Sequence, residues 1–127
     1  MKKEIIAPEN VHKTMGYAHA VKVGNTIYVA GQAAVDHDNN IVGIGDFTAQ
    51  ITQTFENMKR VIEAAGGGMK SVVKTTAYFK NLDDLPAWID VRTKYLGDHE
   101  VAGTVVEISR LAFPEMLIEV DAIAALD

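Results

Sequence analysis

The chain has 127 residues, of which 48% are hydrophobic and 23% charged, a length and composition typical of one globular domain. Its formal net charge is −5 and it has no Lys/Arg cluster, which disfavours a nucleic-acid binder whose affinity depends on cations. It contains no cysteine, so disulfides, thiolate catalysis and cysteine-bound metals are excluded and a cytoplasmic protein is expected.

We expect no signal peptide in the first ten residues, MKKEIIAPEN, because a glutamate and a proline interrupt the apolar segment. No apolar run is long enough to span a bilayer, so we expect no membrane partner. The next segment, residues 18–33, predicts two strands joined by a short hairpin at Gly24 and Asn25.

Helical spacing begins at Asp46, a predicted N-cap, and ends at the glycines of residues 66–68. Residues off the apolar stripe include Gln50, Gln53, Glu56 and Arg60. The stripe itself is Phe47, Ile51, Phe55, Met58, Ile62 and Ala65. Residues 71–80 then alternate as a half-buried strand, whose buried face is expected to carry Val73, Thr75, Ala77 and Phe79.

A second helix is predicted to start at residues 83–86, DDLP, because an aspartate can cap it and Pro86 is tolerated in the first turn. Arg92 interrupts its apolar stripe of Leu85, Trp88, Ile89, Tyr95 and Leu96. Residues 103–109 and 116–126 predict two closing strands, joined across RLAFPE.

The order strand, strand, helix, strand, helix, strand, strand predicts an α+β domain with both helices on one face of a mixed sheet. The other face would be semi-apolar, and such a surface indicates oligomerisation. The side chains expected on it are Tyr28, Thr76, Tyr78, Val105 and Ile123.

Glu119 and Asp121 lie two residues apart in the last predicted strand, so they point to the same face and can act as a paired acid and base. Two solvated carboxylates, or one paired across a subunit interface, are the structural alternative. The sequence predicts no metal, since the segment that begins at Asp36 lacks the glycine and glutamate of a calcium loop. No metal-ligand spacing relates His12, His19, His37 and His99.

Five segments, in this order, resemble those of the RidA/YjgF family, often called the Rid family: MGYAHAV, YVAGQAAVD, QITQTFENMKRVIEAAGG, VVKTTAYFKNLDDL and VVEISRLAFPEMLIEVDAIA. The resemblance covers residues 1–127 as one domain. It implies a chorismate-mutase-like fold and a homotrimer with small-molecule sites between subunits. It also implies hydrolysis of reactive enamines and imines to keto acids and ammonia, without a cofactor.

The resemblance places the pocket at Tyr17, Gly31, the main chain around Val105, and Glu119. In this interpretation Glu119 holds, or donates a proton to, the water that attacks the C=N carbon. Tyr17 would line the cleft, although a core or interface aromatic is its structural alternative. Main-chain groups would bind a substrate oxygen.

The chain departs from the family pattern at residues 101–104, where VAGT stands in place of Pro-Ala-Arg-Ser. Gly103 occupies the position of the arginine that clamps the substrate carboxylate, and Thr104 that of the serine; Ala30 replaces a further serine. Losing such a clamp costs about 2–5 kcal/mol of binding. We therefore expect an arginine-lacking branch of the family with altered substrate choice.

Three functions stay open: a cofactor-free hydrolase of a small C=N or amide compound, a non-catalytic trimer that binds a metabolite or protein, and an endoribonuclease or translation inhibitor. Glu119 favours the first and Gly103 the second, while the acidic charge disfavours the third. Arg92, where relatives often carry tyrosine, either snorkels to the helix end or pairs with a nearby carboxylate such as Asp90 or Glu56. The other interpretation is that it reaches the cleft and supplies the charge that Gly103 lacks.

Overall fold

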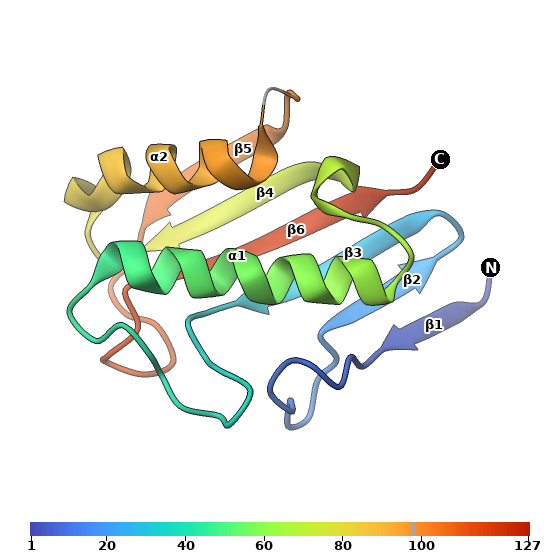
Figure 1. The fold of residues 1–127 in the computed structure, drawn as a ribbon, viewed down its shortest axis with the longest axis horizontal. Coiled ribbons are helices and arrows are strands. Elements are labelled where there is room, and N and C mark those ends of the chain that lie inside the picture. The colour runs from blue at the N-terminus through green and yellow to red at the C-terminus, as the bar shows by residue number, and fades with distance from the viewer. Residues whose placement is uncertain (98) are drawn as a thin grey trace.

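The computed structural model describes residues 1–97 and 99–127, in which one sheet carries two helices on the same face (Figure 1). The strands lie in the order β1-β2-β3-β6-β4-β5, and neighbours are antiparallel except for the parallel pair β4–β5. The predicted mixed α+β domain is confirmed. The six strands are β1 (Lys3–Ile6), β2 (Ala20–Val23), β3 (Thr26–Gln32), β4 (Val72–Phe79), β5 (Ala102–Glu107) and β6 (Ile118–Ala125).

The helices α1 (Phe47–Ala64) and α2 (Leu85–Leu96) cover the core, and short 3-10 turns at Met69–Ser71 (η1) and Leu82–Asp84 (η2) precede β4 and α2. Asp46 caps α1 as predicted, since its carboxylate accepts a hydrogen bond of 3.1 Å from the Ala49 amide. Phe55 joins the two helices, because its ring stacks on Trp88 and Tyr95 at centroid distances of 5.6 and 5.2 Å.

Strands β1 and β4 differ from the sequence interpretation. Strand β1 was not predicted, because only Ile6 of its four residues is buried and the segment shows no alternation. Val73 was expected inside but is exposed, since an irregularity between Val72 and Lys74 shifts the register and buries Val72 instead. Beyond it, Thr75, Ala77 and Phe79 are buried as predicted.

Helix α1 buries polar side chains in addition to its apolar stripe. Gln50, expected off the stripe, is fully buried. Its amide nitrogen donates a 2.8 Å hydrogen bond to the Glu115 carbonyl, and its oxygen accepts one of 2.8 Å from the Leu117 amide. Gln50 therefore fixes the segment that leads into β6. A polar side chain can be buried here because both its amide nitrogen and its amide oxygen form hydrogen bonds.

The sheet face opposite the helices carries Tyr28, Tyr78 and Ile123, as expected from the alternation. Val105 does not belong to it, because it pairs with Ala77, whose side chain is buried on the helix side of the sheet; Val105 itself is 38% exposed. Among the described helices, none is both long and apolar enough to cross a membrane.

Candidate functional site

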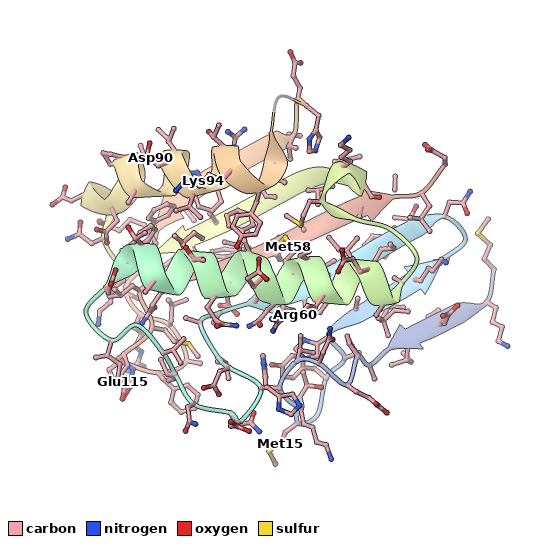
Figure 2. The ribbon with its side chains drawn as sticks, in the orientation of Figure 1. Met15, Met58, Arg60, Asp90, Lys94 and Glu115 are labelled. Carbon is pink, nitrogen blue, oxygen red and sulfur yellow. The ribbon has the colours of Figure 1, made fainter. Side chains whose placement is uncertain are left out.

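A cavity of about 920 Å³, here called the Glu119 cavity, brings Tyr17, Gly31 and Glu119 together. Its walls come from the segment of residues 12–17 and from loop residues 33–44 and 112–116. Met15 and Glu115, two of these wall residues, lie on the loops below α1 in Figure 2, away from Asp90 and Lys94 on α2. The cavity thus lies at one end of the sheet, among loops that α1 supports.

A buried amide on α1 fixes one wall of the Glu119 cavity. Asn57 is 1% exposed, and its side-chain nitrogen donates hydrogen bonds of 3.1 and 2.8 Å to the carbonyls of Ala33 and Val35. Gln50 binds the main chain of the 112–116 wall in the same way. Helix α1 therefore positions two walls through hydrogen bonds that have direction, which apolar packing alone would not provide.

Glu119 is the carboxylate of this cavity, and it projects from β6 with its side chain half-buried. Burial, and after it the charge of Asp121, raises the pKa of Glu119 above its usual range. Asp121 accepts a 3.2 Å hydrogen bond from the Tyr78 hydroxyl. A carboxylate with a raised pKa is a stronger base, and it is well suited to take a proton from water and return it.

Gly31 allows the Glu119 carboxyl group to lie close to β3. A Cβ built on Gly31 would overlap this carboxyl group, although the backbone of Gly31 is not in the left-handed region. The glycine is therefore required by the close approach of the carboxyl group and not by its own dihedral angles. Sequence reasoning singled out both residues, but the contact between them is visible only in three dimensions.

Tyr17 lies on the rim of the Glu119 cavity and is 55% exposed. Burial, and after it the negative charge of Glu119, raises the pKa of the Tyr17 hydroxyl. The hydroxyl group therefore stays a proton-bearing donor at neutral pH. The Thr14 hydroxyl donates a hydrogen bond of 2.5 Å to the Tyr17 carbonyl and holds this short segment.

His12 also lines the Glu119 cavity, and sequence reasoning assigned it no role. Burial, and after it His19, lowers the pKa of His12, while Asp36 opposes the shift. A ring nitrogen of His19 is 2.7 Å from the His12 carbonyl, and its other nitrogen is 3.2 Å from the side-chain nitrogen of Gln32. No spacing along the chain indicates this cluster, because its members come from three segments.

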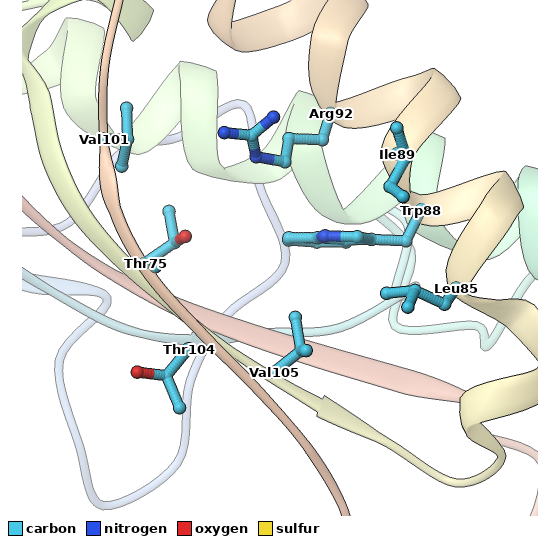
Figure 3. A pocket seen from close by; sticks show the side chains of 9 residues that line it. Thr75, Leu85, Trp88, Ile89, Arg92, Val101, Thr104 and Val105 are labelled. Atoms are coloured by element: carbon cyan, nitrogen blue, oxygen red, sulfur yellow. The ribbon is translucent and has the colours of Figure 1, made fainter.

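A second cavity, of about 340 Å³, lies between α2 and β5 and is here called the α2–β5 cavity (Figure 3). Gly103, Thr104 and Val105 line it from β5, and Arg92 lines it from α2. The sequence singled out all four as substrate-binding candidates. The remaining lining residues are Thr75, Leu85, Trp88, Ile89 and Val101.

A single chain does not bring the two groups of candidate residues together. Glu119 pairs with Tyr78 on the sheet face opposite the helices. Gly103 pairs with Thr75, which is buried beneath the helices. The Glu119 cavity and the α2–β5 cavity share no lining residue, so the single chain places the candidate residues in two separate cavities.

Potential metal ligands do not cluster in the part of the chain that the structure describes. Over residues 1–97 and 99–127, no three His, Asp or Glu side chains are grouped so that they could hold an ion.

Comparison with known proteins assigns a family. Residues 8–126 match the family model described as Endoribonuclease L-PSP. The chain is 41% identical to a RutC family protein of Pyrococcus abyssi, with 98% of each chain covered. It is 33% identical to the 3-aminoacrylate deaminase RutC of Acinetobacter baylyi, over 98% of each chain. It is 34% identical to the 2-iminobutanoate/2-iminopropanoate deaminase of Salmonella typhimurium, over 94% of each.

The fold is also that of solved structures. RidA from the Antarctic bacterium Psychrobacter is 31% identical and superposes with a TM-score of 0.90, with 97% of this chain and 99% of that chain covered. The same sheet and the same two helices are therefore shared over nearly the full length.

Proposed function

Because this chain belongs to the RidA/YjgF family, we propose that it is a cofactor-free hydrolase that releases ammonia from a small enamine or imine. The relatives named 3-aminoacrylate deaminase and 2-iminobutanoate/2-iminopropanoate deaminase support this reaction class. The observation that carries the proposal is Glu119, a half-buried carboxylate of raised pKa that faces a cavity beside Gly31 and Tyr17.

The chemistry needs one water and one carboxylate. Glu119 takes a proton from the water while the water oxygen bonds to the C=N carbon, and the proton is returned to the nitrogen. In the resulting carbinolamine, Glu119 passes the hydroxyl proton to the amino nitrogen as the C–N bond breaks, so that ammonia leaves and a carbonyl group remains. The Tyr17 hydroxyl, a donor at neutral pH in a residue that lines the cavity, would bind the substrate or this water.

The working site would form where two subunits meet in a homotrimer of chorismate-mutase-like architecture. Two features support this arrangement: the candidate residues fall into two separate half-sites, and every residue of the edge strand β5 is exposed in the single chain. An exposed edge strand with valines at 36–38% exposure is a surface that another chain can cover. The β5 edge of one subunit would close the Glu119 cavity of its neighbour.

Substrate choice would differ from that of arginine-bearing relatives. Strand β5 offers no cation at Gly103, so the carboxylate of 2-iminobutanoate would not be clamped from this strand. We expect weak turnover of that imine and faster turnover of compounds whose anionic group lies elsewhere or is absent. Because it has no arginine at Gly103, the chain would belong to an arginine-lacking branch of the family.

A non-catalytic binding module is the second candidate, and the loss of the arginine and serine positions at Gly103 and Ala30 favours it. An endoribonuclease, the activity in the family model's description, is weaker because the chain carries a net charge of −5.

The test is hydrolysis of 2-iminobutanoate and 3-aminoacrylate, generated in the assay, measured as keto-acid or ammonia release above the spontaneous rate. We expect Glu119→Gln to lose at least about 100-fold of the enzymatic rate, within the usual contribution of acid–base catalysis. The matched control Glu63→Gln, an exposed carboxylate on α1, should keep the wild-type rate. A folded wild type that accelerates neither of these reactions, nor the hydrolysis of an imine without a carboxylate, would support the binding module instead.

A further inference from the structure

The α2–β5 cavity has an unusual charge balance. Its nine lining residues include one cation, Arg92, and no carboxylate. The other walls are aliphatic, apart from two threonines and the indole of Trp88. A cavity of about 340 Å³ with a single positive group is suited to a small anion, because a guanidinium binds carboxylates through paired donors.

Arg92 points into this cavity. Its side chain extends from α2 toward Val101 and Thr75 on the far wall (Figure 3). It forms no ion pair within residues 1–97 and 99–127. The guanidinium therefore faces the cavity without a counter-charge from these residues.

The two partners that the sequence offered to Arg92 do not hold it. Glu56 accepts a 2.6 Å hydrogen bond from the Tyr95 hydroxyl and lies 4.0 Å from Arg60. Asp90 lies two positions before Arg92 on the same helix, a spacing at which side chains do not face each other. Arg92 therefore pairs with neither Glu56 nor Asp90 in this structure.

Gly103 leaves the space that an anion would need. A Cβ at this position would meet only the Thr75 hydroxyl at 3.8 Å and the Val101 carbonyl at 3.9 Å, which are ordinary contacts. Its backbone is not in the left-handed region. Neither crowding nor dihedral strain requires glycine here, and a glycine inside a strand often marks a place where a ligand approaches the backbone.

We propose that Arg92 is the anion-binding residue of this protein: it holds the carboxylate of a small ligand in the α2–β5 cavity, against the open main chain at Gly103. The cation thus enters from the helix instead of the strand, and the carboxylate is bound at a different place in the pocket. This inference deepens the proposed function. It rests on that function only in one respect, which is that the ligand's carboxylate is attached to an enamine or imine.

The structure supplies its own probe, because Trp88 is the only tryptophan of the chain and lines the same cavity. Tryptophan fluorescence is titrated with propionate, and with the neutral isostere propionamide, at constant ionic strength. We expect a saturable response to propionate and at least about 10-fold weaker binding of propionamide, because a charge-assisted contact is lost.

The variant Arg92→Met keeps the volume and removes the charge. We expect it to weaken propionate binding by about 10- to 100-fold. The control Arg110→Met changes an exposed arginine outside both cavities and should bind as the wild type does. In the double variant Gly103→Arg/Arg92→Met, the strand supplies the cation and propionate binding should return.

Two outcomes overturn the inference: a wild type with no saturable response to propionate, or an Arg92→Met protein of unchanged circular dichroism and assembly that binds propionate as tightly as before. The Glu119→Gln variant distinguishes the test of anion binding from the test of hydrolysis. This variant should lose hydrolysis and keep propionate binding. If no hydrolysis is found in any variant but binding depends on Arg92, the anion site stands and the hydrolase proposal fails.

Discussion

At the scale of single residues, the position and the pKa of the Glu119 carboxyl group depend on two neighbours, Gly31 and Asp121. Sequence reasoning reached Glu119 and Asp121 because a strand points alternate side chains to one face. It did not reach His12, whose neighbours in the cavity come from distant segments. Burial and the neighbouring charge, which give Glu119 its pKa, depend on the fold and are not visible along the chain.

The acid side of the pH–rate profile should report Glu119. If Glu119 acts as a base, activity falls as the pH drops through its pKa, and a raised pKa moves this fall to higher pH. Asp121→Asn removes one cause of the raised pKa, so the fall in kcat/KM should move to lower pH. The asparagine can still accept the bond from Tyr78. If the pH dependence of kcat/KM were the same in Asp121→Asn and in the wild type, Asp121 would not influence the pKa of the reacting base.

Gly31→Ala should separate activity from stability. The added methyl group would overlap the Glu119 carboxyl group, which is the mobile end of a side chain and can move aside. We expect a loss of unfolding free energy below about 1 kcal/mol but a fall in kcat of about 100-fold, because the base is displaced. Gly68→Ala is the control, since its Cβ would meet nothing within 4 Å and its φ of −163° is extended. If kcat were the same in both variants, Glu119 would not be the base of the reaction.

At the scale of elements, the sequence predicted both helices and most of the sheet. Helix α1 has a clear stripe and an aspartate cap, and these local signals are sufficient. Strand β1 was missed because its pairing with β2, and not its own pattern, makes it a strand. The burial of Gln50 and Asn57 was missed because their hydrogen-bond partners are main-chain groups of distant loops.

Asn57→Leu tests the role of α1 in holding the cavity wall. The leucine would leave the carbonyls of Ala33 and Val35 without the donor that they share. We expect the free energy of unfolding in urea to fall by about 1–3 kcal/mol, because the Val35 carbonyl loses this donor, whereas the Ala33 carbonyl keeps a 2.8 Å hydrogen bond from the Val35 amide. Glu63→Leu, at an exposed position of the same helix, should change stability by less than about 0.5 kcal/mol. A stable Asn57→Leu protein would show that the loops need no tether.

At the scale of the whole molecule, we expect a trimer in which β5 lies at the contact between subunits. Val106→Lys would put a charge on this exposed edge strand, on the sheet face away from the helices. Light scattering should show a trimer for the wild type and smaller species for the variant, because a buried charge disfavours association. Ile5→Lys, on the opposite edge strand β1, is the control and should remain trimeric. A wild-type monomer at micromolar concentration would contradict the shared site.

The separation of Glu119 and Arg92 into two cavities has a consequence for mixtures of subunits. If each working site takes Glu119 from one copy and Arg92 from the next, two impaired proteins can complement each other. Glu119→Gln and Arg92→Met subunits, unfolded together in equal amounts and refolded, would restore about a quarter of the sites by random pairing. Activity in the mixed sample that exceeds the mean activity of the two variants refolded alone would show that each site is shared by two neighbouring copies.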